Sequence, residues 1–162
     1  RAIQLTKSLL LLSRIQNRQL EEVAEVDMNR HARHIIGLLS DLYEEKELDY
    51  HLSDTETCRI RMNESLAHTL LTNLIKNAII HSPDHGRVDI VIHSARIEII
   101  NDGNQALDKQ QIFKRFYKGN AGQKESTGLG LSIAQSIANL YHIKLTYYHD
   151  GRHHFVLKIA KP

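Results

Sequence analysis

Helical and strand-like segments follow one another along this chain of 162 residues without the strict strand–helix–strand alternation that builds a parallel sheet. Helix-period patterns cover residues 29–46, 63–80 and 128–141. Strand-like patterns cover 48–53, 58–62, 87–92, 96–100, 143–148 and 153–159, and Asp150-Gly151 offers a hairpin turn to the last two. This order predicts an α+β fold in which helices cover a mixed sheet.

The N-terminal segment carries an apolar pattern that points to a neighbouring helix. Ala2, Leu5, Leu9 and Leu12 follow one another at three- and four-residue spacing, which is the seam of a helix packed on another helix. We expect residues 1–20 to be the end of a bundle helix whose partners lie elsewhere or in a second chain, followed by a domain at 21–162. The alternative is that this helix covers the core of the same domain.

Charge and composition narrow the class of protein. Lys and Arg total 21 against 19 Asp and Glu, so the net charge of +2 does not suggest a nucleic-acid partner. The single cysteine, Cys58, excludes an internal disulfide and fits a reducing compartment. No stretch approaches the roughly 20 apolar residues of a membrane span, and the chain reads as a fragment without a signal segment. The reduced Cys58 therefore predicts a cytoplasmic domain.

Two asparagines stand at the apolar face of the segment 63–80. On a helical wheel Asn77 projects inside the apolar arc and Asn73 lies at its edge, one turn earlier. A buried amide that finds no partner costs about 1–3 kcal/mol. Its oxygen could bind a hard cation such as Mg²⁺, and the alternative is an ordinary core or capping amide.

Glycines and cations gather between residues 103 and 130. Gly128-Leu129-Gly130-Leu131 stands at the start of the third predicted helix, where free N–H groups favour an anion such as phosphate. The preceding segment carries basic residues that would match phosphate charges, namely Lys109, Lys114, Arg115, Lys118 and Lys124. Turn glycines and a solvated basic loop are the alternative explanations.

In this order, these segments resemble the nucleotide-binding boxes of sensor histidine kinases, which are members of the GHKL superfamily. Residues 73–83, NLIKNAIIHSP, resemble the N box, and Asn101-Asp102-Gly103 resembles the first glycine box. Residues 112–118, IFKRFYK, resemble the F box, and residues 126–134, STGLGLSIA, resemble the second glycine box. The leading helix is similar to the second helix of the family's dimerisation hairpin.

The resemblance implies a two-layer α/β sandwich, with about three helices on the mixed sheet and a bundle helix before it. It implies that ATP and Mg²⁺ lie between the helices and a lid, with Asn77 as the Mg²⁺ ligand. Arg115 and Lys118 would act as catalytic residues that reach the phosphates. The other implied ATP-binding residues are Asn73, His81, Asn101, Asp102, Gly103, Phe116, Tyr117, Thr127, Gly128, Leu129, Gly130 and Leu131.

Four positions depart from the family pattern. Asn101 stands where the family has its adenine-binding acid; its amide oxygen still accepts a hydrogen bond, and Asp102 would substitute in a register shifted by one residue. Ile80 replaces a basic residue, while Gln105 and Ser126 replace glycines. Each loss is expected to weaken ATP binding by about 1 kcal/mol. The alternative is a degenerate kinase domain that serves as a signalling or interaction module with little ATP binding.

The resemblance also implies the location and the partners of the domain. The domain would be cytoplasmic, in a protein with room for an inner-membrane anchor upstream. The γ-phosphoryl of Mg-ATP would pass to a histidine outside this fragment, on the protein's own dimerisation and phosphoacceptor domain. It would then pass to an aspartate of a response-regulator receiver domain. The N-terminal helix allows either a homodimer in the intact protein or a monomeric fragment. An ATPase of the superfamily is disfavoured because Asn73 replaces the Glu that activates water there.

Overall fold

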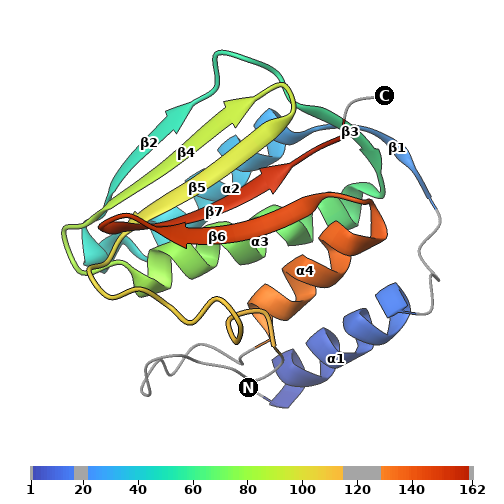
Figure 1. Ribbon diagram of the computed structural model, residues 1–162, viewed down its shortest axis with the longest axis horizontal. Helices are drawn as coiled ribbons and strands as arrows, with labels where there is room; N and C mark the ends of the chain where they lie inside the picture. The colour runs from blue at the N-terminus through green and yellow to red at the C-terminus, as the bar shows by residue number, and fades with distance from the viewer. Residues whose placement is uncertain (1, 17–21, 115–128, 161–162) are drawn as a thin grey trace.

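The computed structural model describes residues 2–16, 22–114 and 129–160 as seven strands, four α-helices and a short 3₁₀ helix (Figure 1). The helices are α1 (Ala2–Gln16), α2 (Met28–Leu42), η1 (Glu44–Lys46), α3 (Glu64–His81) and α4 (Gly130–Leu140). The strands are β1 (Ala24–Asp27), β2 (Asp49–Ser53), β3 (Arg59–Met62), β4 (Arg87–His93), β5 (Arg96–Asp102), β6 (Lys144–His149) and β7 (Arg152–Lys158).

One mixed sheet forms the first layer of the fold. Its strand order is β2-β4-β5-β7-β6; β2 and β4 are parallel, and the other neighbours are antiparallel. Helices α2 and α3 lie behind one face of this sheet in Figure 1, and α4 packs beside α3 below β6. The predicted α+β sandwich with a mixed, helix-covered sheet is therefore confirmed.

The polar segment at residues 54–58 joins β2 to β3, and these two strands belong to different sheets. Strand β2 pairs with β4 in the large sheet, whereas β3 pairs with β1 in a separate two-stranded sheet. This segment meets α2, because the buried Asn29 side chain donates to the Glu56 carbonyl and accepts from the Cys58 N–H. Strand β3 is thereby led away from the large sheet and towards the start of α3.

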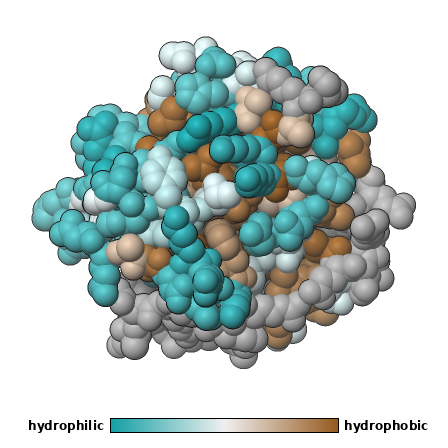
Figure 2. Space-filling view, in the orientation of Figure 1, coloured by the Kyte–Doolittle hydropathy of each residue, from teal (hydrophilic) through white to brown (hydrophobic). Residues whose placement is uncertain are grey.

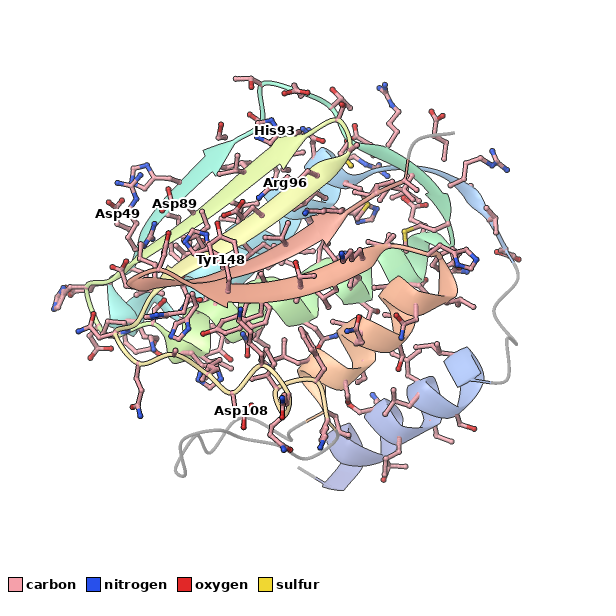
Figure 3. All side chains as sticks on the ribbon, in the orientation of Figure 1. Asp49, Asp89, His93, Arg96, Asp108 and Tyr148 are labelled. Carbon is pink, nitrogen blue, oxygen red and sulfur yellow. The ribbon has the colours of Figure 1, made fainter. Side chains whose placement is uncertain are left out.

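The core lies between the sheet and the helices. Along β5, Ile97, Ile99 and Asn101 are buried while the residues between them are half-buried, so the alternating pattern places one set against the helices. On the opposite face of the sheet, hydrophilic residues predominate, with hydrophobic areas visible between them (Figure 2). Figure 3 shows Asp89, Arg96 and Tyr148 on that face, over β4, β5 and β6.

Helix α1 lies beside α4 and away from the sheet (Figure 1). Its Leu12 and Ile15 are buried, whereas Leu9 and Leu10 are exposed. Within one chain the helix therefore covers part of the domain and keeps a second apolar face open, and the division at residues 20 and 21 stays a prediction. None of the described helices is both long and apolar enough to cross a bilayer.

Candidate functional site

Helix α3 aligns the side chains of Asn73, Asn77 and His81, because residues four apart lie one turn above another. All three are half-buried. The Asn73 amide nitrogen donates to the Thr69 carbonyl at 2.8 Å, which leaves its oxygen directed elsewhere. The Asn77 amide makes no hydrogen bond to any described residue, so its oxygen remains available to a ligand.

The start of α4 reaches this row of side chains. A Cβ added to Gly130 would lie 3.1 Å from Oδ1 of Asn73, so the glycine allows the two helices to approach closely. Leu129, which precedes α4, is buried, and Leu131 packs against the core. Asn73 of the N box and Gly130 of the second glycine box thus meet where the free N–H groups of α4 begin.

An open cavity of about 780 Å³ lies beyond the C-terminal end of α3. His81, Asp102 and Gly103, three of the predicted binding residues, line it together with Lys46, Ile80, Ser82, Pro83, Asp84, Asn104 and Gly151. Burial and then the charge of Lys46 lower the pKa of His81, which keeps its imidazole neutral at pH 7. The cavity brings the N box and the first glycine box together from two elements.

Lys46 is a basic residue of this cavity that the sequence pattern did not indicate. It comes from η1, and its Nζ donates to the Ile80 carbonyl at 3.1 Å. Ile80, which replaces the family's basic residue, packs against the hydrophobic core instead of offering a charge. No sequence signal could have paired Lys46 with Ile80, because the two residues are 34 positions apart and η1 meets the end of α3 only when the chain is folded.

Asn101 and Asp102 point to opposite faces of β5. Asn101 is buried on the helix side, and its amide nitrogen donates to the Asp102 carbonyl at 3.0 Å. The Asp102 carboxylate accepts hydrogen bonds from the Arg87 backbone N–H at 2.9 Å and from Arg152 Nε at 2.7 Å. Asn101 and Asp102 are the two alternatives for the family's adenine-binding acid. Of these two, Asn101 is the one that faces the side of the sheet on which α3 lies.

His153 is a further residue at this place that the sequence pattern did not indicate. It lies opposite Asn101 in the β5–β7 ladder and is buried. A Cβ added to Gly103 would collide with its Nε2 atom, so the space beside this glycine belongs to His153. Burial, followed by the neighbouring His149, lowers the pKa of His153 to about 4.

The segment that the resemblance implies as a lid is described only at its ends. The predicted residues Arg115, Phe116, Tyr117, Lys118, Thr127 and Gly128 lie outside the described residues. At the near end Ile112 is buried, and the ring of Phe113 packs edge-on against Phe155 with centroids 6.2 Å apart. The start of this segment is therefore anchored to the sheet.

The donor set fits a magnesium ion that is held mainly by a nucleotide. Among the described residues, no three His, Cys, Asp or Glu side chains converge on a point that could hold a metal. Mg²⁺ commonly takes only one or two protein ligands and fills its shell with waters and phosphate oxygens. The amide oxygen of Asn77, which accepts no hydrogen bond within the described part of the chain, suits that role.

Comparison with known families identifies the larger part of the chain. Residues 62–161 match the family described as histidine kinase-, DNA gyrase B- and HSP90-like ATPases. The chain is 36% identical to the heme sensor protein HssS of Staphylococcus epidermidis, over 96% of this chain and 36% of that protein. It is 29% identical to the sensor histidine kinase HprS of Escherichia coli, over 98% of this chain and 36% of that protein.

Solved structures share the fold. The catalytic domain of the histidine kinase ThkA superposes with a TM-score of 0.75 at 24% identity, covering 86% of this chain and 96% of that one. The histidine kinase AdeS of Acinetobacter baumannii superposes with a TM-score of 0.79 at 23% identity, covering 97% of this chain and 77% of that one. The present chain spans about a third of the length of the curated relatives that it matches.

Proposed function

The chain belongs to the family of histidine kinase-, DNA gyrase B- and HSP90-like ATPases and is the ATP-binding catalytic domain of a sensor histidine kinase, and we propose that it transfers the γ-phosphoryl of Mg-ATP to a histidine of the same protein outside this chain. The observation that carries the proposal is the meeting of Gly130 with the Asn73 amide oxygen. It joins a row of asparagines to a helix N-terminus, as a phosphate-binding site requires.

Each element would have a distinct task in the transfer. The Asn77 oxygen would hold Mg²⁺, which neutralises phosphate charge when it is bound. Backbone N–H groups at 128–130 would bind phosphate oxygens, and Arg115 and Lys118 would stabilise the charge that develops on the phosphoryl group during transfer. Asn73 would orient the site without activating water, because an amide is no general base.

The acceptor histidine and the partners belong to the proposal. A histidine followed by an acid, the pair typical of the acceptor helix, occurs here at His149-Asp150. That pair lies at the β6–β7 turn, where His149 Nε2 donates to the Gly103 carbonyl, so it is not presented on a helix. The acceptor would therefore lie on the dimerisation domain of the intact protein, and an aspartate of a response regulator would receive the phosphate. The degenerate-module alternative gains no support from the comparisons.

Calorimetric titration of Mg-ATP tests the nucleotide site directly. We expect binding at micromolar to low-millimolar affinity, and Asn77→Ala should weaken it at least tenfold by removing the metal ligand. Asn139→Ala is the matched control, because Asn139 is an exposed asparagine on α4. Equal binding by Asn77→Ala and Asn139→Ala would overturn the metal assignment. The absence of any ATP binding would overturn the proposed function.

Phosphotransfer is tested with the dimerisation domain of the same protein as the acceptor. We expect radiolabel from [γ-³²P]ATP to enter a dimerisation domain mixed with this chain and then to move to a cognate receiver domain. The label should be stable to base and labile to acid, as a phosphohistidine is. Label on this chain alone would contradict the assignment of the acceptor.

A further inference from the structure

We propose that His31 of α2 and His68 of α3 bind one divalent transition-metal ion, such as Zn²⁺, through their Nδ1 atoms. The two helices pack against each other, so the ion joins one to the other. This site goes beyond the proposed function, because no step of ATP binding or phosphoryl transfer uses either histidine.

The distance between the two imidazoles fits a single metal ion. Their Nδ1 atoms lie 3.3 Å apart, and the ring planes are inclined by 66°, so the nitrogens meet while the ring faces do not stack. Zinc binds a histidine nitrogen at about 2.0–2.1 Å, and tetrahedral geometry then separates two such nitrogens by about 3.3–3.4 Å. One ion can therefore bind both side chains with little movement of either helix.

The hydrogen bond of His31 to Glu64 leaves the Nδ1 atom of the histidine as an acceptor. Nε2 of His31 lies 3.1 Å from Oε1 of Glu64, and a carboxylate only accepts, so Nε2 carries the hydrogen. In the neutral ring, Nδ1 then offers its lone pair to a metal. Arg30 donates from Nη2 to the same carboxylate oxygen at 2.7 Å, which holds Glu64 in place. A carboxylate behind a ligating histidine is the arrangement that fixes the ring in metal sites.

His68 can supply the second lone pair. Without a metal, the short distance suits a hydrogen bond in which Nδ1–H of His68 donates to Nδ1 of His31. Nε2 of His68 makes no hydrogen bond to any described residue, so the proton can move to that atom. Both Nδ1 atoms then face one ion, and binding needs no proton to leave either neutral ring.

The histidine pair makes the site without a third protein ligand. The ring of His34 also lies near His68, with centroids 6.1 Å apart, but it is exposed, and no three such side chains converge on a metal position in the described part of the chain. The His31 side chain is 13% exposed and His68 is half-buried, so water reaches the pair and fills the remaining coordination positions. Imidazole nitrogens select zinc, copper or nickel, whereas Mg²⁺ prefers oxygen.

This site is separate from the nucleotide site, although both use α3. His68 precedes Asn77 by nine residues, which is about two and a half turns of helix, so the two side chains face opposite sides. His68 faces His31 on α2, whereas Asn73 faces Gly130 at the start of α4. Zinc binding is therefore expected to be independent of Mg-ATP.

Zinc titration of the untagged chain, without nucleotide, tests the site. With a chromophoric zinc chelator as the competitor, we expect one Zn²⁺ per chain at micromolar affinity. His31→Ala and His68→Ala should each weaken this binding at least tenfold, because each removes one of the two protein ligands. His93→Ala is the matched control, since His93 also pairs with a glutamate, Glu56, but lies on β4, and its affinity should stay within twofold of the wild type. Equal affinities in all four proteins would overturn the inference.

NMR of the wild-type chain keeps the test decisive even if a variant does not fold. The first equivalent of Zn²⁺ should shift the ¹⁵N resonances of Nδ1 in His31 and His68. Shifts at other histidines, with these two unchanged, would place the ion elsewhere and overturn the inference, and so would the absence of zinc binding at micromolar concentrations. Loss of Mg-ATP binding would overturn the proposed function and leave this inference standing, because the two sites share no residue.

Discussion

At the scale of single residues, the His153 side chain occupies the space beside Gly103 in which a Cβ atom would otherwise stand. Gly103→Ala would force its Cβ into Nε2 of His153, which Tyr147 holds in place. Overpacking of this kind costs about 1–3 kcal/mol of unfolding free energy. We expect urea denaturation to show that loss in the wild-type background and a much smaller loss in His153→Ala, because the truncated side chain leaves room for the Cβ.

Gly37 supplies the matched control for that cycle. A Cβ at this position of α2 would meet nothing within 4 Å. Gly37→Ala should therefore raise the unfolding free energy by about 0.5–1 kcal/mol, since alanine favours the helix. A loss at Gly103 that persists unchanged in His153→Ala would show that backbone strain, and not the histidine, causes it.

The lowered pKa of His153 also predicts how the free energy of unfolding depends on pH. Its pKa is lowered to about 4 in the folded chain from an ordinary value of 6.5, mainly by burial. The unfolded chain therefore binds more protons between these values, and stability falls as pH falls below 6.5. Between pH 7.0 and 5.5 this histidine alone should cost about 1 kcal/mol. His68 and His81, whose pKa values are also lowered by burial, add to the loss.

Urea denaturation at the two pH values measures this effect above the range in which carboxylates titrate. The pKa values of Asp89 and Glu98 are lowered by hydrogen bonds that outweigh their burial, so both stay ionised at pH 5.5. His153→Phe should show a smaller loss than the wild-type chain between the same pH values. An equal loss in both proteins would contradict the assigned cause.

The residues of the candidate site that the sequence could indicate are those whose pattern is visible within a short stretch of the chain. Asn73, Asn77 and His81 share a helix face, and the spacing of three side chains on one helix is enough to show it. Lys46 and His153 arrive from η1 and β7, and their places depend on strand pairing and on the cavity that the folded chain leaves. Local periodicity carries no information about such contacts.

At the scale of elements, Asn29 attaches the segment that follows β2 to helix α2. Its side chain joins α2 to the turn at residues 56–58 through two hydrogen bonds, of 2.7 Å to the Glu56 carbonyl and 2.9 Å from the Cys58 N–H. Asn29→Ala removes both bonds from a buried position, and we expect a loss of about 2 kcal/mol in chemical denaturation. Asn139→Ala, an exposed asparagine on α4, should cost less than about 0.5 kcal/mol. Equal losses would show that the turn holds without Asn29.

The existence of the elements was predictable, but their partners were less so. The alternation of Val88, Ile90 and Ile92 predicts a strand with one buried face, and β4 has this pattern. The segment after β2 joins two successive strands, as the sequence predicts, but the pattern of these strands does not show that they pair in different sheets. The buried Asn29 side chain binds the segment between these strands, and its contacts lie 27 and 29 residues away, so they leave no periodic trace in the sequence.

At the scale of the whole molecule, α1 is the element whose membership of the domain decides where the catalytic unit begins. It lies beside α4, with Leu12 and Ile15 buried, and the sheet and the other helices are complete without it (Figure 1). We expect a chain of residues 22–162 to fold cooperatively and to bind Mg-ATP with an affinity within threefold of the full chain. Each of the two buried side chains contributes about 1.5–3 kcal/mol, so the unfolding free energy should fall by several kcal/mol. Urea denaturation measures the fall, and calorimetry measures the affinity.

Leu12→Ala in the full chain should reproduce part of the loss, whereas Leu10→Ala, at an exposed position, should not. A shortened chain that fails to fold would place α1 inside the domain and move the boundary from residue 21 to the N-terminus.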